Sequence, residues 1–150
     1  TRSEYNFCMS KFRFYAPIKV RYGDLDPQGH VNNAKYLTYL EQARIQYLRH
    51  LNLWKGGSFQ EIGVILAEVK LTFHASIQYG QHIQVGVKVT QLGNKSMNVE
   101  HLIEEAKTGQ QMASGSSVLV AYDYRTASSI LIPPEWRQII TEFEGLPSEN

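Results

Sequence analysis

Apolar and polar positions in the first third of the chain follow two different periods. Residues 13–22 read as a strand, because their apolar members recur along a short run that ends at a polar turn: Phe14, Tyr15, Ile18 and Val20. From about Ala34 to Leu53 apolar residues recur every three or four positions, at Tyr36, Leu40, Ala43, Tyr47 and Leu51. This period predicts a helix about 30 Å long with a broad apolar stripe. Asn32 or Asn33 is predicted to cap the helix, and Trp54-Lys55-Gly56-Gly57 to end it.

After the helix the period changes to two, which predicts strands over residues 64–73, 83–89, 97–103 and 117–122. The first of these is expected to present one apolar face: Ile65, Ala67, Val69, Leu71 and Phe73. Turn signals separate the strands at residues 78–81, 93–95 and 107–109. Connections this short favour antiparallel neighbours. Pro133-Pro134 then opens a short terminal helix through Trp136, Ile139, Ile140 and Phe143.

The order of elements predicts an α+β fold in which one striped helix lies on one antiparallel sheet. Residues 1–150 form one predicted domain, since the sequence contains no repeat, low-complexity tract or linker. A chain of 150 residues with 43% hydrophobic residues is large enough to bury a core.

The charge and the cysteine content of the chain argue against several classes of function. Fifteen Lys+Arg against fourteen Asp+Glu leave a formal charge of +1, so no global field indicates nucleic acid or a membrane as partner. The single cysteine, Cys8, cannot form an intramolecular disulfide, and no neighbour favours it as a nucleophile. The first residues lack the apolar segment of a signal peptide, and no apolar run approaches the length of a membrane span. We therefore expect a cytoplasmic protein.

The stretch GDLDPQGHVNN, residues 23–33, concentrates polar and turn-forming residues between the first strand and the helix. Its Asp-x-Asp-x-Gln-Gly start imitates a calcium loop, but the twelfth position is Lys35, where that loop requires a bidentate Glu. Zinc is also disfavoured, because no cysteine cluster or ligand spacing accompanies the five histidines: His30, His50, His74, His82 and His101. We expect no metal. Phosphate-loop, dinucleotide-binding and Gly-x-Ser-x-Gly motifs are absent from the sequence.

Two interpretations of this stretch remain. A capped turn explains Asp24, Gln28 and Asn32 one by one, because such side chains bond nearby backbone groups. A reaction site explains why so many special residues gather at one helix N-terminus. Free N–H groups there can stabilise an oxyanion, and an ionised carboxylate beside them can attack an electrophilic carbonyl or activate water. An oxyanion site beside an ionised carboxylate suits the hydrolysis of a thioester.

The segment VRYGDLDPQGHVNNAKY at residues 20–36, continued by YLEQAR at 39–44, resembles the hot-dog-fold acyl-CoA thioesterases of the 4-hydroxybenzoyl-CoA thioesterase type. The similarity continues through residues 73–80 and through LGNKS at 92–96, and spans about residues 14–125. It implies a long central helix wrapped by an antiparallel sheet, and hydrolysis of an acyl-CoA or acyl-carrier-protein thioester. It also implies no cofactor beyond the CoA of the substrate, and a homodimer or homotetramer with sites between subunits.

The same resemblance assigns roles to individual residues. The catalytic carboxylate falls on Asp26, and the oxyanion donor is the backbone N–H of Asn33. Gly29 permits the close approach of the substrate, and His30 and Asn32 orient the site.

Substrate contacts are assigned further along the chain. The CoA phosphates are expected at Asn94, Lys95 and Ser96. Tyr36 and Tyr39 are expected in the core, with lining of the substrate pocket as the alternative for Tyr36.

Other titratable residues have simpler explanations. Glu41 is the main rival carboxylate, but Arg44 three positions on predicts an ordinary ion pair. Glu68 is expected to be a solvated strand residue, and His74 and His101 to be hydrogen-bonded structural histidines. Two other functions stay open: an acyl-CoA-binding module without turnover, and a hydratase or dehydratase that would use His30 beside Asp26.

Overall fold

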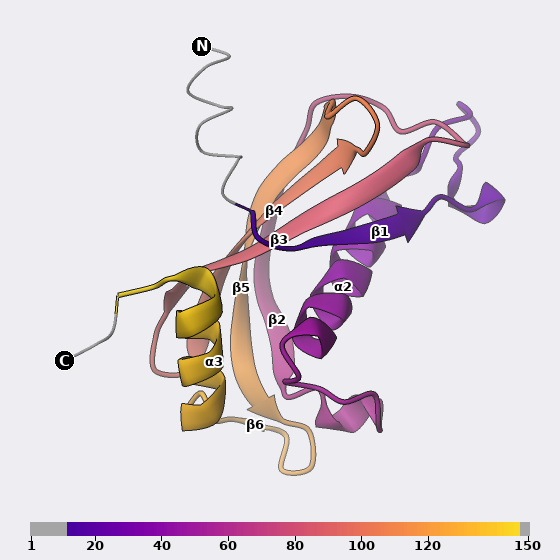
Figure 1. The fold of residues 1–150 in the computed structure, drawn as a ribbon. Helices are drawn as coiled ribbons and strands as arrows, with labels where there is room; N and C mark the ends of the chain where they lie inside the picture. Colours follow the sequence, from indigo (N-terminus) through magenta and orange to yellow (C-terminus); the bar gives the residue numbers. More distant parts are fainter. Residues whose placement is uncertain (1–11, 148–150) are drawn as a thin grey trace.

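The structure is a computed structural model, and it describes residues 12–147. Its main feature is a curled antiparallel sheet in the order β1-β3-β4-β5-β2. The strands are β1 (Tyr15–Lys19), β2 (Val64–Phe73), β3 (His82–Leu92), β4 (Ser96–Glu105) and β5 (Gln111–Asp123), with the short β6 (Ser128–Ser129) paired to β5. The sheet curls around the long helix α2 (Asn33–His50), and α3 (Pro134–Glu144) lies beside the far end of β3 (Figure 1). The turns η1 (Tyr22–Asp24) and η2 (Phe59–Glu61) complete the fold.

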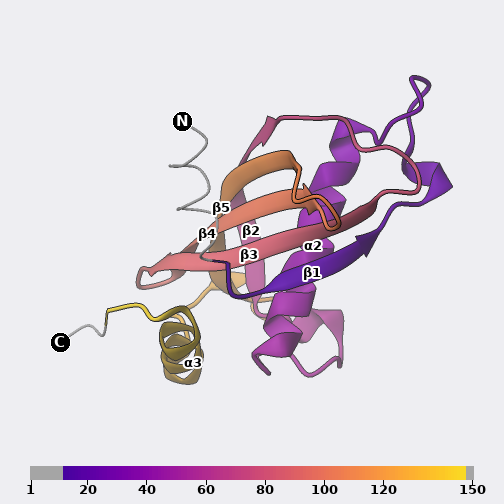
Figure 2. The same ribbon diagram turned by 45° about the horizontal axis from the view of Figure 1, so that its top comes forward.

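The core lies between α2 and the sheet. The predicted stripe of α2 is buried, through Tyr36, Tyr39, Leu40, Ala43, Tyr47 and Leu48. It packs mainly against β1 and β3, whose buried residues include Ile83, Val85, Val87 and Val89 (Figure 2). Each large side chain buried this way contributes about 1.5–3 kcal/mol. The predicted α+β hot-dog arrangement, with its short C-terminal helix, is confirmed. Within the described part of the chain, no helix has both the length and the apolar character to cross a membrane.

Helix α2 begins where it was predicted but ends earlier. Asn32 is the N-cap, since its Oδ1 accepts the N–H of Ala34 at 2.9 Å. The helix stops at His50 instead of Leu53 because Asn52 adopts a left-handed conformation with φ 58°. The N–H of Leu53 then bonds the carbonyl of Leu48 at 2.8 Å. These bonds satisfy the last carbonyls of the helix, so the prediction that residues 54–57 end it was wrong.

Strand β2 does not form a hairpin with β3, although the short turn predicted at residues 78–81 suggested one. Instead β2 pairs with β5 at one edge of the sheet, and β3 pairs with β1 and β4. The connecting residues 74–81 run along the end of the sheet, where Ile77 is fully buried and its carbonyl accepts the N–H of Val31 at 2.9 Å. This connection therefore supports the polar stretch before α2. The strands β3, β4 and β5 are also longer than the patterns predicted.

The apolar face predicted for β2 is interrupted by a bulge at Ala67. Leu66 pairs with Leu119 and Glu68 with Val118, so Ala67 has no partner and the alternation reverses there. The inner face is consequently Val64, Leu66, Val69, Leu71 and Phe73, while Ile65 lies on the side of Glu68 and Lys70. Of the ten residues of β2 only Val64 is buried, and Phe73 is 46% exposed. Within residues 12–147, the strand thus forms an apolar edge that no other element covers.

Candidate active site

The polar stretch folds into a tight loop closed by backbone hydrogen bonds. The N–H of Asp26 donates to the carbonyl of His30 at 2.9 Å, and the N–H of Gly29 donates to the carbonyl of Asp26 at 2.9 Å. Gly29 has φ 86°, a left-handed conformation that a residue with a side chain rarely adopts. The glycine is therefore required by the turn itself, which returns the chain toward α2.

Asp24 is a structural carboxylate. Its Oδ2 accepts the hydroxyl of Tyr39 at 2.7 Å and the N–H of Arg21 at 3.0 Å. Tyr39 is buried in the core, as predicted, and burial together with the Asp24 charge raises the pKa of its hydroxyl. The pair ties the loop to the first turns of α2, which confirms the capped-turn interpretation for Asp24.

Asp26 is held by other contacts than Asp24. Its Oδ1 accepts the N–H of Gln28 at 3.0 Å, and its Oδ2 lies 3.5 Å from Nδ1 of His30. The Asp26 side chain is 12% exposed and that of His30 is 34% exposed. His30 forms an isolated β-bridge with Gln78 of the β2–β3 connection. The carboxylate is thus fixed by a backbone donor and an imidazole, and both groups still reach solvent.

The start of α2 supplies a backbone donor to the same loop. Asn33 is the first helical residue, and in the part of the chain that the structure describes its N–H meets no acceptor. Asn32 orients this turn by capping Ala34 and by donating its own N–H to the carbonyl of Asp24 at 2.9 Å. An unpaired N–H at a helix N-terminus favours negative charge. Asp26, Gly29, His30, Asn32 and Asn33 are therefore brought together at one end of the molecule.

Aromatic rings surround this end of the molecule. Tyr36 is 2% exposed and packs edge-to-face on Phe73 with ring centroids 4.9 Å apart. Burial raises the pKa of its hydroxyl. Tyr22 and Tyr79 make a second edge-to-face pair and are 80% and 61% exposed. Tyr36 is thus a core residue, and its contact with the exposed Phe73 keeps a lining role open.

The residues assigned to CoA lie elsewhere within one chain. Asn94 and Lys95 form the β3–β4 loop with Ser96 just after it, and this loop and the N-terminus of α2 occupy opposite ends of the molecule (Figures 1 and 2). The 18 residues of α2 alone extend about 27 Å. Lys95 Nζ donates to Ser129 Oγ at 3.4 Å. A single chain therefore does not join the two halves of the predicted site.

The rival histidines have structural roles. His101 is 3% exposed, and its Nε2 lies 2.9 Å from Ser117 Oγ. Burial and then the charge of Arg44 lower the pKa of His101 to about 4, so the ring is neutral at pH 7. His74 Nε2 lies 2.7 Å from Ser114 Oγ, which confirms both histidines as hydrogen-bonded structural residues.

The remaining carboxylates lie apart from the loop. Glu68 is exposed on β2, as predicted. Glu41 is exposed on α2, and among residues 12–147 its predicted partner Arg44 is not within ion-pair distance, although the two charges interact. Burial lowers the pKa of Arg44, and the charge of Glu41 opposes this effect. No cluster of three or more potential metal ligands occurs in the described ranges. Cys8 lies outside the described residues.

Sequence reasoning missed the contribution of Ile77 and Gln78, which bond the backbone of the loop at Val31 and His30. The only local signal was an apolar residue inside a segment of turn formers. Its pairing depends on a long-range contact that no period reveals.

Comparisons with known proteins identify the family of the chain. Residues 20–140 match the family model of the thioesterase-like superfamily. The long-chain acyl-CoA thioesterase FadM of Escherichia coli is 26% identical over 121 residues, which are 81% of this chain and 92% of FadM. A thioesterase of Thermus thermophilus, solved with coenzyme A and Zn, is 33% identical with a TM-score of 0.80, and the match covers 93% of this chain and 100% of the other. The chain belongs to the thioesterase-like superfamily.

Proposed function

We propose that Asp26 is the catalytic carboxylate with which this thioesterase hydrolyses acyl-CoA thioesters. The observation that supports it is the placement of a fixed, partly accessible carboxylate in the loop that leads directly to Asn33, whose N–H meets no acceptor among residues 12–147. Relatives named as acyl-CoA thioesterases support the choice of substrate class. The proposal includes a cytoplasmic location and no cofactor beyond the CoA of the substrate.

The chemistry follows from the two groups. The thioester carbonyl oxygen accepts the N–H of Asn33, which stabilises the charge that develops on it; one well-placed donor is worth about 3–4 kcal/mol in the transition state. Asp26 either attacks the carbonyl carbon or takes a proton from the water that attacks it. The carbon–sulfur bond then breaks and the thiolate of CoA takes a proton, from Asp26 when water is the nucleophile and from solvent when Asp26 attacks. In the second case water then hydrolyses the acyl-aspartyl anhydride, which releases the free acid and restores the carboxylate. His30 and the N–H of Gln28 hold the carboxylate in position.

The complete site is proposed to form between two copies of the chain. Among residues 12–147, nothing pairs with the outer edge of β2, which carries apolar side chains such as Phe73 and Ile65. Pairing two β2 strands antiparallel about a two-fold axis would cover this edge. It would also bring the β3–β4 loop of one chain to the end of the sheet at which the partner's α2 begins. A homodimer, alone or paired into a homotetramer, is therefore expected.

The test is release of free thiol from acetyl-, decanoyl-, palmitoyl- and benzoyl-CoA. Asp26→Asn should lower kcat by about 100- to 10,000-fold, the usual contribution of a catalytic acid or base, with unchanged circular dichroism. Glu41→Gln is the matched control, because it removes the rival carboxylate. Wild-type turnover in Asp26→Asn, or loss of turnover in Glu41→Gln alone, would contradict the assignment.

The contact between Asp26 and His30 at 3.5 Å also favours a hydratase as the second candidate, since that chemistry needs a His paired with an acid. Incubation with crotonyl-CoA distinguishes the two. Loss of the conjugated enoyl absorbance without thiol release would select the hydratase.

A further inference from the structure

Phe59 is a large apolar side chain that stays exposed within residues 12–147. It is the first residue of η2, between α2 and β2, and it is 69% exposed. Its ring stacks on the ring of the buried Trp54, with centroids 5.4 Å apart. Trp54 Nε1 donates to the carbonyl of Ser58 at 3.2 Å, and Ser58 Oγ accepts the N–H of Gln60 at 3.2 Å. The Phe59 ring is therefore held on a fixed base, with most of its surface open.

A second exposed apolar surface lies at the other end of β2, beside the start of α2. Phe73 is the last residue of β2, is 46% exposed and packs edge-to-face on Tyr36. Leu37, the next residue of α2, is 44% exposed. We call Tyr36, Leu37 and Phe73 the acyl platform. Tyr36 and Leu37 lie one helical turn, about 5 Å, from Asn33. An acyl group whose carbonyl accepts the N–H of Asn33 therefore lies beside the platform.

Phe59 and the acyl platform are far apart within one chain. The strand β2 extends about 30 Å from Val64 to Phe73, and η2 precedes Val64, beyond the C-terminal end of α2 (Figures 1 and 2). When two β2 strands pair antiparallel about a two-fold axis, Val64 of each chain lies near Phe73 of the other. The turn η2 of each chain then lies at the end of the partner at which α2 begins. Phe59 consequently approaches the acyl platform from the partner subunit and not from its own chain.

Charged residues of β2 favour this pairing. Glu68 and Lys70 are both exposed, lie on the same face of the strand and flank Val69 near its centre. A two-fold axis through Val69 sets Glu68 of each chain opposite Lys70 of the partner subunit. Opposite charges directly across two antiparallel strands stabilise the pair. The same register brings the start of each β2 beside Phe73 of the partner subunit.

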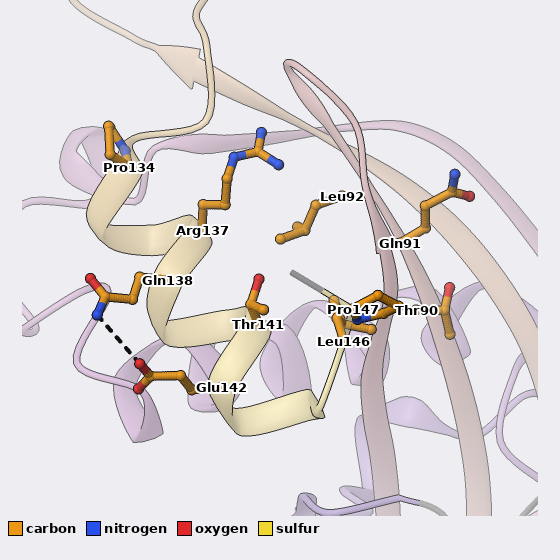
Figure 3. Close-up of a pocket in the computed structure, with 10 residues that line it drawn as sticks. All are labelled: Thr90, Gln91, Leu92, Pro134, Arg137, Gln138, Thr141, Glu142, Leu146 and Pro147. Atoms are coloured by element: carbon orange, nitrogen blue, oxygen red, sulfur yellow. Dashed lines mark hydrogen bonds between the residues drawn. The ribbon is translucent and has the colours of Figure 1, made fainter. Parts of the chain in front are cut away.

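A cavity of about 600 Å³ beside α3 is the rival place for an acyl chain (Figure 3). Its lining combines the apolar Leu146 and Pro147 with the charged side chains of Arg137 and Glu142. The cavity adjoins β3, which the strands β4 and β5 separate from β2 in the sheet. Charged groups lose hydration when an alkyl chain covers them. The acyl platform, which is apolar and adjoins Asn33, is therefore the better site.

We propose that Phe59 of each chain forms one wall of the acyl site of its partner, where it covers an apolar acyl group that lies on the acyl platform. The inference rests on the proposed function, in which two β2 strands pair and the thioester lies between Asp26 and Asn33. It deepens that function by naming the acyl class. Two aromatic walls bury a medium-length or long apolar chain and give an acetyl group little to contact. Phe59 is thus a specificity-determining residue that acts across the subunit interface.

The first test is thiol release from acetyl-CoA and decanoyl-CoA by the full chain. Phe59→Ala should lower the ratio of kcat/KM for decanoyl-CoA to that for acetyl-CoA by about 10- to 100-fold, as expected for loss of the area that a Phe side chain buries. Phe59→Leu keeps an apolar wall and should keep most of the ratio. Leu131→Ala is the matched control, because Leu131 is 66% exposed and lies outside η2 and β2. Thr141→Trp fills the rival cavity and should also keep the ratio. An unchanged ratio in Phe59→Ala, or a tenfold fall in Thr141→Trp alone, would overturn the proposal.

Mixed dimers show which chain supplies the ring. Co-expression of Asp26→Asn and Phe59→Ala chains that carry different affinity tags gives a heterodimer, which two successive affinity columns isolate. Its one active site combines Asp26 of the Phe59→Ala chain with Phe59 of the Asp26→Asn chain. The heterodimer should show the wild-type ratio at about half of the wild-type kcat, since one of two symmetric sites is active. The lowered ratio of the Phe59→Ala homodimer would instead place the ring in the site of its own chain and would overturn the proposal.

A binding measurement separates this inference from the proposed function. S-decyl-CoA carries a thioether in place of the thioester and is not hydrolysed. In isothermal titration it should bind Phe59→Ala at least tenfold more weakly than wild type, whereas CoA should bind both equally. Equal affinity of S-decyl-CoA for the two proteins would contradict the role of Phe59. Failure of the proposed function gives a different result: Asp26→Asn turns over like wild type, while the titration still reports on Phe59.

Discussion

Glu144, at the C-terminal end of α3, is a carboxyl group buried against the central helix. The residue is 7% exposed, and its Oε1 accepts the hydroxyl of Tyr47 at 3.3 Å. In the described part of the chain Oε2 has no hydrogen-bond partner. Burial raises the pKa of Glu144 from 4.5 to about 7, although the Tyr47 bond and the charges of Arg13 and Lys88 oppose the shift. The side chain is therefore largely protonated in the folded protein at mildly acidic pH.

This raised pKa makes the folded state less stable as pH increases. Between pH 4.5 and pH 7 the folded chain binds a proton at Glu144 that the unfolded chain has released. The stabilising contribution is complete below pH 4.5 and is lost as pH rises through about 7. Each tenfold change in proton affinity is worth about 1.4 kcal/mol, so the whole contribution of Glu144 to the free energy of unfolding is about 3 kcal/mol. About 2.5 kcal/mol of it falls between pH 5 and pH 8.

Glu144→Gln tests this reasoning because the amide keeps an acceptor for Tyr47 but does not ionise. The free energy of unfolding of wild type should fall by about 2.5 kcal/mol relative to Glu144→Gln from pH 5 to pH 8. Urea unfolding followed by fluorescence of Trp54 and Trp136, at one protein concentration, measures it. Glu142→Gln, an exposed change on the same helix, is the control and should run parallel to wild type. If the free energies of unfolding of wild type and Glu144→Gln differ by the same amount at every pH, the carboxyl of Glu144 ionises normally and the reasoning is refuted.

Three further changes test other parts of the fold. Asn32→Ala removes the cap of α2 and should lower the free energy of unfolding by about 1 kcal/mol, whereas Asn32→Asp keeps a capping oxygen and should be as stable as wild type. Gly115→Ala would drive a Cβ into the backbone oxygen of Lys70. We therefore expect it to lower the free energy of unfolding, measured by thermal unfolding, by more than about 2 kcal/mol. The control Gly23→Ala has open space around the new Cβ and should lower it far less. Because the pKa of His101 is lowered in the folded protein, the free energy of unfolding falls as pH falls from 6.5 toward 4. His101→Asn should therefore be less stable than wild type at pH 7.5, and this deficit should shrink by about 2.5 kcal/mol at pH 4.5 in urea unfolding.

Much of the local structure could be predicted from the sequence. The three-to-four period of Tyr36, Leu40 and Ala43 is a property of one segment, and it located the central helix and its buried face. The cap at Asn32 was also predictable, because an N-cap bonds an N–H only two residues away. The end of α2 was misjudged, since Asn52 adopts the left-handed turn that the prediction had assigned to the later glycines.

The candidate site also has a part that the sequence predicts and a part that it does not. The loop from Asp26 to Asn33 is contiguous, so its residues had to lie near one another and the motif was sufficient to identify them. The site also depends on Ile77, which fastens the loop from a segment about 45 residues away, and no local pattern predicts that contact.

The sequence by itself therefore determined the elements, the chemistry of the polar loop and the family, because each depends on residues close together in the chain. Only the tertiary structure decided that β2 lies at a sheet edge beside β5, and that a bulge at Ala67 reverses its faces. It also decided that Lys95 and Asp26 lie at opposite ends of one chain, and that a groove opens beside Arg137. These features arise from strand pairing and helix packing between distant segments, where many alternatives share the same local pattern and the packing of the whole core selects one.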